Sequence, residues 1–209
     1  MPAVEQPVSF AAGSLRLEGR LCQMAGPKAA LIAHPHPLYG GDLDNPVVGV
    51  IAAAYQRRGY TTLRFNFRGV NASEGQYADG PGERDDVRAA ATYLAERDKI
   101  VTDLAGYSFG AWINLTLAPP LASARRQLLV APPLAFLDFS NLPEPVAEWL
   151  VIVGERDEFA PPARLREWLR RWQPTARLHV LPGTDHFYGD ALDRLAVSVE
   201  ALLDPSLDR

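Results

Sequence analysis

Cysteine is almost absent from this chain. Cys22 is the only one in 209 residues, so no disulfide can close within the chain and no Cys-rich zinc site can be built. Because Cys22 lies in an apolar, strand-like stretch, we expect it to be a small buried side chain. His34 and His36 form a close pair, but no carboxylate is spaced with them on the same element. We therefore expect neither a metal site nor a cofactor.

Long apolar runs and basic clusters are also missing. No run of 18 apolar residues could form a membrane-spanning helix, and residues 1–13 lack the basic start and apolar run of a signal peptide. The net charge of −4 provides no basic patch for nucleic acid or a membrane surface. We expect a cytoplasmic monomer or homodimer whose partner is a small molecule.

Linkers, repeats and low-complexity segments are likewise not found. The chain is 47% hydrophobic and 22% charged, which is typical of a globular protein. Its length suits one domain with a sizeable core. We therefore expect residues 1–209 to form a single domain.

Short apolar runs alternate with longer amphipathic segments. A hairpin is predicted at residues 8–10 and 15–22, turning at Gly13. Further strands are expected at residues 29–33, 61–67, 101–107, 128–131, 149–153 and 177–181, and helices at residues 47–58, 82–98, 109–117, 161–172 and 187–203. This order predicts an α/β fold, a mostly parallel twisted sheet with helices on both faces. Ligands of such sheets bind where loops leave the carboxyl ends of the strands.

One of these loops contains a G-x-S-x-G pattern between a predicted strand and a predicted helix. It reads Gly106-Tyr107-Ser108-Phe109-Gly110. A serine on such a sharp turn needs strained backbone angles, and flanking glycines remove side chains that would clash. The helix that follows stabilises negative charge at its N-terminus. Ser108 is therefore the candidate nucleophile, although the pattern alone also fits a flexible glycine-containing loop.

A serine hydroxyl needs a base to react at neutral pH. Of the four histidines, His179 lies within a predicted strand, where a structural role is favoured. His186 follows the last predicted strand and thus lies at the same sheet edge as Ser108. We assign His186 as the base, and the alternative is a histidine of a helix-capping loop.

The base needs an acid that holds its tautomer and stabilises the imidazolium. Asp157 follows a predicted strand and precedes a helix, and it is our candidate. Asp138 and Glu155 are competitors, and Asp185 is poorly placed to reach the ring of its neighbour His186.

The transition state of acyl transfer also needs donors for its oxyanion. The first is expected to be the backbone N–H of Phe109, the residue after the nucleophile. The second should come from the loop that starts at residue 34. Pro35 and Pro37 have no N–H, which leaves His36 and Leu38, with His36 slightly preferred.

No cap domain is expected over the site. Only about 17 proline-rich residues, 132–148, separate two predicted strands where larger hydrolases carry a helical cap. An open site favours small to medium esters over long lipids. Candidates for its apolar wall, each equally plausible as ordinary packing, are Tyr39, Phe109, Phe136, Phe159 and Tyr188.

Taken together, these motifs resemble those of the small, lidless α/β-hydrolases of bacteria, which are related to dienelactone-hydrolase-like and acyl-peptidase-like esterases. The matching blocks span residues 30–190 and are His34-Pro35-His36-Pro37 with Gly40, Gly41 and Asn45, residues 64–70 with Ser73 and Gly75, residues 106–110, residues 154–157, and residues 185–187. The resemblance implies a Ser-Asp-His triad, hydrolysis of esters or related acyl groups, and a mainly architectural Arg68-Gly69 turn.

We therefore expect a serine hydrolase that cleaves small to medium carboxylic esters through an acyl-serine intermediate, so its expected partner is a small-molecule acyl substrate. The same triad would serve a thioesterase, a peptidase or a C–C hydrolase. A non-catalytic binding protein with a hydrolase fold is the remaining alternative.

Overall fold

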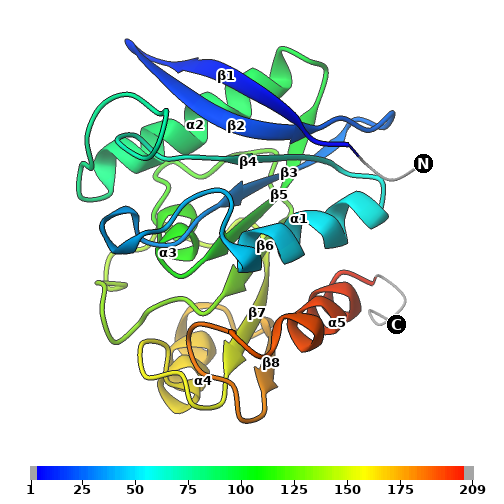
Figure 1. Ribbon diagram of the computed structural model, residues 1–209. Coiled ribbons are helices and arrows are strands. Elements are labelled where there is room, and N and C mark those ends of the chain that lie inside the picture. The colour runs from blue at the N-terminus through cyan, green and yellow to red at the C-terminus, as the bar shows by residue number, and fades with distance from the viewer. Residues whose placement is uncertain (1–3, 205–209) are drawn as a thin grey trace.

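The computed structural model describes residues 4–204, and these contain one eight-stranded sheet with five α-helices around it (Figure 1). The strands are β1 (Gln6–Ala12), β2 (Leu15–Cys22), β3 (Lys28–Ala33), β4 (Thr61–Phe65), β5 (Ile100–Tyr107), β6 (Arg126–Val130), β7 (Glu148–Gly154) and β8 (Arg177–Leu181). The helices are α1 (Pro46–Arg57), α2 (Pro81–Ala95), α3 (Phe109–Leu115), α4 (Pro162–Trp172) and α5 (Leu192–Leu202).

The sheet is parallel except at one edge. Its strand order is β1-β2-β4-β3-β5-β6-β7-β8, and only the β1–β2 and β2–β4 pairs are antiparallel. The β1–β2 hairpin turns at Gly13, whose φ of +63° favours glycine. The parallel strands end at a common edge, so the loops that follow β3, β5, β7 and β8 are brought together there. The predicted α/β-hydrolase fold is confirmed.

The central strands are apolar on both faces because helices cover both. In β3, Ala30 and Ile32 join a core cluster with α1 and α5, whereas Leu31 and Ala33 join a second cluster with α2 and α3. The two-residue alternation of a strand thus supplies two separate cores from one segment. Cys22 is buried, as the sequence predicts.

Predicted element boundaries differ from the observed ones mainly at the last helix. The sequence predicts a helix over 187–203, but α5 begins at Leu192. Tyr188 has a φ of +57°, which an α-helix does not allow, and its ring is fully buried. Burial of this ring therefore overrides the local helical pattern.

Within residues 4–204, the segment between β6 and β7 forms no helix, so no helical cap is inserted there. In residues 4–204 we find no helix with the length and apolar character needed to span a bilayer.

Candidate active site

Ser108 lies on a sharp turn between β5 and α3. Its φ of 52° and ψ of −114° are strained for a residue with a side chain. A Cβ at Gly106 would collide with the backbone of Gly110, and a Cβ at Gly110 would collide with the carbonyl of Ala33. The two glycines therefore let the turn pack tightly against β3, and the Ser108 hydroxyl faces a cavity beyond the strand ends.

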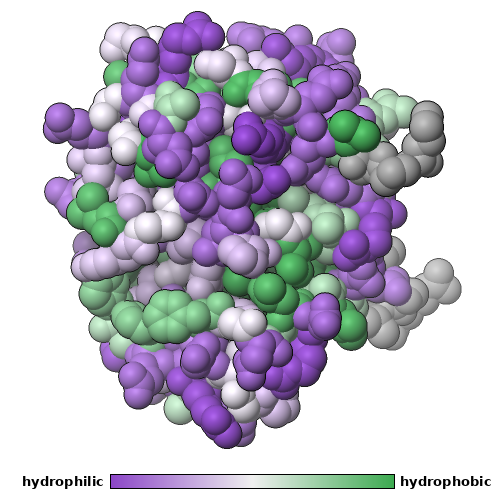
Figure 2. All heavy atoms as spheres, in the orientation of Figure 1, coloured by the Kyte–Doolittle hydropathy of each residue, from purple (hydrophilic) through white to green (hydrophobic). Residues whose placement is uncertain are grey.

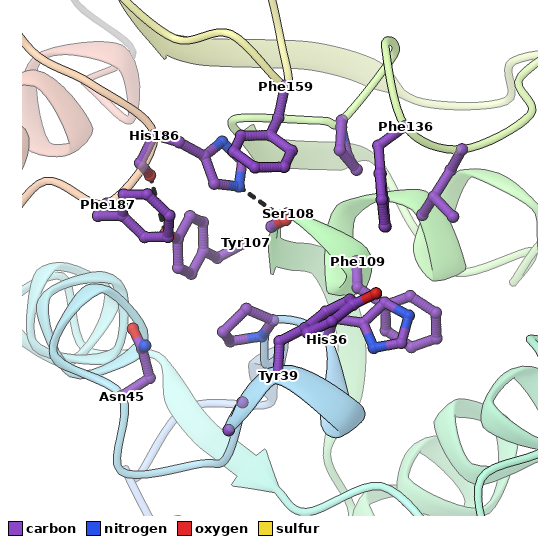
Figure 3. A pocket seen from close by; sticks show the side chains of 15 residues that line it. His36, Tyr39, Asn45, Tyr107, Ser108, Phe109, Phe136, Phe159, His186 and Phe187 are labelled. Atoms are coloured by element: carbon purple, nitrogen blue, oxygen red, sulfur yellow. Dashed lines mark hydrogen bonds between the residues drawn. The ribbon is translucent and has the colours of Figure 1, made fainter.

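Three side chains from different loops are joined to each other by hydrogen bonds. The Ser108 Oγ lies 3.0 Å from His186 Nε2 (Figure 3). His186 Nδ1 lies 2.8 Å from Asp157 Oδ2. All three residues are less than one-tenth exposed. A carboxylate accepts hydrogen bonds, so Asp157 selects the tautomer with a proton on Nδ1. His186 Nε2 is then free to accept the hydroxyl proton of Ser108.

The Asp157 carboxylate is held by its own loop. Its Oδ1 accepts hydrogen bonds from the backbone N–H groups of Phe159 at 2.9 Å and Ala160 at 2.8 Å. These donors compensate the buried charge and fix the carboxylate toward His186. Gly154, at the start of this loop, leaves no room for a Cβ against the carbonyl of Thr184, so the Asp157 and His186 loops pack closely.

The competing carboxylates have other partners. Glu155 accepts a hydrogen bond from the Gly183 N–H at 2.7 Å, and Asp185 accepts one from the Phe187 N–H at 2.9 Å. Asp138 is exposed, and hydrogen bonds from the Ser140 side chain and from the Ser140 backbone N–H lower the pKa of its carboxyl. Asp157 is thus the carboxylate that contacts His186.

The loop after β3 is built around a buried histidine. His34 Nε2 accepts a hydrogen bond from the Phe67 N–H at 3.0 Å, and its Nδ1 contacts the Pro35 carbonyl at 2.6 Å. Burial lowers the pKa of His34 to about 4. Both ring nitrogens are occupied within the protein, so His34 is a neutral structural residue.

His36 and Leu38 are distinguished by their hydrogen bonds. The Leu38 N–H donates to the Nδ1 atom of His36 at 3.2 Å, whereas the His36 N–H donates to no group within residues 4–204. Phe109 is the first residue of α3, so its N–H has no acceptor one turn back in the helix. The residues that line the cavity include His36 and Phe109 but not Leu38.

The cavity in front of Ser108 has a volume of about 460 Å³. Four of the predicted wall residues line it, namely Tyr39, Phe109, Phe136 and Phe159. The prediction for Tyr188 is wrong, because its ring lies in the core and its hydroxyl contacts the Ile152 carbonyl at 3.5 Å. Its neighbour Phe187 lines the cavity instead.

Arg68 lies outside the cavity lining and forms an ion pair with Asp86. Its guanidinium and backbone N–H donate to both oxygens of the fully buried Asp86, with a shortest contact of 2.7 Å. The contact ties the loop after β4 to α2, which agrees with an architectural role for the Arg68-Gly69 turn.

His179, in the edge strand β8, is exposed and lies outside the cavity lining. Among residues 4–204, no group of three or more His, Cys, Asp or Glu side chains is arranged to hold a metal ion.

Comparisons with known proteins identify the fold and the family of the chain. No family model matches the chain. The uncharacterized protein RP471 of Rickettsia prowazekii is 32% identical over 186 residues, which is 83% of this chain and 78% of that protein. XC6422 of Xanthomonas campestris, an α/β serine hydrolase without a lid, is 31% identical with a TM-score of 0.85, over 97% of this chain and 95% of that structure. The chain belongs to the lidless α/β serine hydrolases.

A second solved structure extends the comparison. The α/β serine hydrolase homologue of Coxiella burnetii is 29% identical to this hydrolase, with a TM-score of 0.84 over 95% of this chain and 97% of that one. The likeness covers nearly the full length of both proteins, so the fold and general hydrolase class of this lidless hydrolase are shared with them.

Two residues of the site, Tyr107 and Phe187, are not predicted from the sequence. Tyr107 lies in the G-x-S-x-G pattern at a position where any residue is allowed, yet its hydroxyl donates to the His186 carbonyl at 2.8 Å. Phe187 lines the cavity but is not among the predicted wall residues. Its place next to the candidate base is the one signal in the sequence that could indicate it.

Proposed function

We propose that this hydrolase cleaves small to medium neutral carboxylic esters through an acyl-serine intermediate. The observation that carries the proposal is the relay of hydrogen bonds from Ser108 through His186 to Asp157 at the base of the cavity. Serine, a base and an orienting acid in this arrangement are what nucleophilic acyl transfer requires.

The first half of the reaction forms a new ester on the protein. Ser108 Oγ attacks the carbonyl carbon while its proton moves to His186 Nε2, and Asp157 stabilises the imidazolium that results. The N–H groups of Phe109 and His36 donate to the oxyanion of the tetrahedral intermediate. His186 then gives its proton to the leaving alkoxide oxygen, the C–O bond breaks, and the alcohol departs.

The second half restores the serine. His186 takes a proton from a water molecule, whose oxygen attacks the acyl carbon. The second tetrahedral intermediate breaks its bond to Ser108 Oγ, which receives the proton back from His186. One water is consumed, and one acid and one alcohol are released.

Labelling with a fluorophosphonate probe, followed by mapping of the modified residue, tests this proposal. The label should appear on Ser108 in the wild type, be absent in Ser108→Ala, and persist in Ser9→Ala, which alters an exposed serine in β1. A label elsewhere, or none, would contradict the proposal and favour a binding protein. Rates on matched esters, thioesters and peptide amides then identify the acyl bond that is cleaved.

A further inference from the structure

The mouth of the cavity carries an unusual concentration of exposed aromatic rings. Within residues 4–204, the exposed aromatic side chains are Tyr39 at 74%, Phe136 at 50%, Phe159 at 37% and Phe187 at 66%. All four line the same cavity, although they come from four separate loops. Figure 2 shows a band of hydrophobic residues across the lower middle of the molecule, with mostly hydrophilic residues above and below it. Clustered apolar exposure of this kind indicates a binding surface.

The rings form one continuous arc over Ser108. Ring centroids are 6.0 Å apart between Tyr39 and Phe136, 6.0 Å between Phe136 and Phe159, and 6.2 Å between Phe159 and Phe187. These distances suit edge-to-face contacts, so each ring stabilises the position of the next. The arc therefore holds its shape without a covering lid.

The cavity carries no fixed charge. Its lining contains no Lys, Arg, Asp or Glu side chain, and burial lowers the pKa of His36, which keeps that imidazole neutral at pH 7. A carboxylate or phosphate next to the reacting carbonyl would find no cationic partner there. The part of the substrate inside the cavity is therefore uncharged.

The chemistry of the proposed reaction assigns the two sides of the cavity. The leaving oxygen must reach His186 Nε2 to be protonated, so the alcohol lies on the His186 side. In Figure 3, Phe187 and Tyr107 lie on that side of Ser108, whereas Phe109 and Phe136 lie on the opposite side. The acyl group is thus directed toward Phe136.

The acyl side is lined mainly by rings. Phe136 and His36 contribute to it, and the fully buried Phe109 packs behind His36, with ring centroids 4.7 Å apart. Leu137 is the single aliphatic side chain other than proline in the cavity lining. Aryl groups gain from edge and face contacts with such rings beyond the burial of area, whereas saturated rings gain only from burial.

Resting on the proposed function, we infer that this hydrolase selects neutral esters whose acyl group carries an aromatic ring. The ring lies against Phe136 and His36. The expected preference over a saturated ring of similar shape is roughly 2- to 10-fold, the range measured for aromatic pairs.

A matched pair of substrates tests this inference. Ethyl phenylacetate and ethyl cyclohexylacetate share the alcohol, and a methylene separates each ring from the carbonyl, so their intrinsic reactivities are similar. Cyclohexyl is the more hydrophobic group, and burial alone would favour it. We expect kcat/KM for the phenyl ester to be higher by the stated factor.

Variants locate the preference at Phe136. Phe136→Leu keeps an apolar side chain but removes the ring, and it should bring the ratio of phenyl to cyclohexyl kcat/KM to one or below. Phe136→Tyr keeps the ring and should keep the ratio. Phe187→Leu, on the alcohol side, is the matched control and should leave the acyl ratio unchanged. A wild-type ratio of one or less, or a ratio unaffected by Phe136→Leu, would overturn the inference.

Binding separates this inference from the proposed function. Dissociation constants of the two esters for Ser108→Ala, measured by NMR titration, report ring selection without turnover. Tighter binding of the phenyl ester, with no hydrolysis by the wild type, would support the selection of rings and reject the esterase reaction. Equal affinities, or tighter binding of the cyclohexyl ester, would reject the inference even if both esters are hydrolysed.

Discussion

The phenol of Tyr107 donates a 2.8 Å hydrogen bond to the backbone carbonyl of His186, and both groups are buried. The residue before the candidate nucleophile thus anchors the loop that carries the candidate base. Strand β5 and the loop after β8 are 79 positions apart in sequence at this contact, so one buried hydrogen bond sets the relative position of two reacting groups.

This contact makes Tyr107→Phe an informative variant. Removal of the hydroxyl leaves the His186 carbonyl without its donor, and we expect a loss of about 1–2 kcal/mol in the free energy of unfolding. The less constrained His186 should lower kcat by about tenfold with a smaller change in KM. Urea unfolding and steady-state ester hydrolysis measure the two effects. A variant that is destabilised but keeps its kcat would show that Tyr107 has no positioning role.

Asp157→Asn should damage the reaction without damaging the fold. The Asn oxygen can still accept from the Phe159 and Ala160 N–H groups, but its amide then presents N–H to His186 Nδ1. His186 must carry its proton on Nε2 and can no longer accept from Ser108. We expect kcat to fall by about 10⁴-fold, as for loss of the correct tautomer in serine proteases. The melting temperature is the control, and a fall of less than tenfold with an intact fold would assign the orienting role elsewhere.

Two glycines offer a matched pair for the turn at Ser108. A Cβ at Gly110 would collide with the Ala33 carbonyl, whereas a Cβ at Gly49, in α1, has no neighbour within 4 Å. Gly110→Ala should therefore lower the free energy of unfolding by at least about 2 kcal/mol. Gly49→Ala should raise it by about 0.5–1 kcal/mol, the helix penalty of glycine. Thermal unfolding measures the change in stability of each variant relative to the wild type. Equal changes would mean that the turn at Ser108 accommodates the Cβ of Gly110→Ala without strain.

His34 makes the stability of this hydrolase depend on pH. Burial lowers its pKa from 6.5 to about 4, so between these values the unfolded chain binds more protons than the folded one. Its contribution is fully present above about pH 6.5 and is lost as the pH falls toward 4, by about 3 kcal/mol in total. Urea unfolding of the wild type and His34→Gln across this range measures the effect. The free energy of unfolding should fall more steeply with decreasing pH for the wild type than for His34→Gln. The same dependence on pH in both proteins would contradict the prediction.

The predicted elements follow from local physics. Apolar runs flanked by turn residues yield the strands, and residue spacing yields the helices, because these periodicities depend on neighbours in the chain. The same reasoning places Ser108, Asp157 and His186 at one edge of the sheet. It fails at Tyr188, where a left-handed backbone and a buried ring replace the expected start of a helix.

Sequence alone determined the α/β class, the chain order of the candidate residues and the lack of a cap, since each depends on residue type and spacing. Only the tertiary structure decided which carboxylate meets His186, because Asp157, Glu155 and Asp138 all follow strands and differ only in where their side chains lie. It also decided that His36, whose N–H has no acceptor within residues 4–204, lines the cavity, whereas Leu38 does not and donates its N–H to His36. The arrangement of the four aromatic rings could not be predicted from the sequence either. The rings come from loops that meet only when the parallel strands align their carboxyl ends.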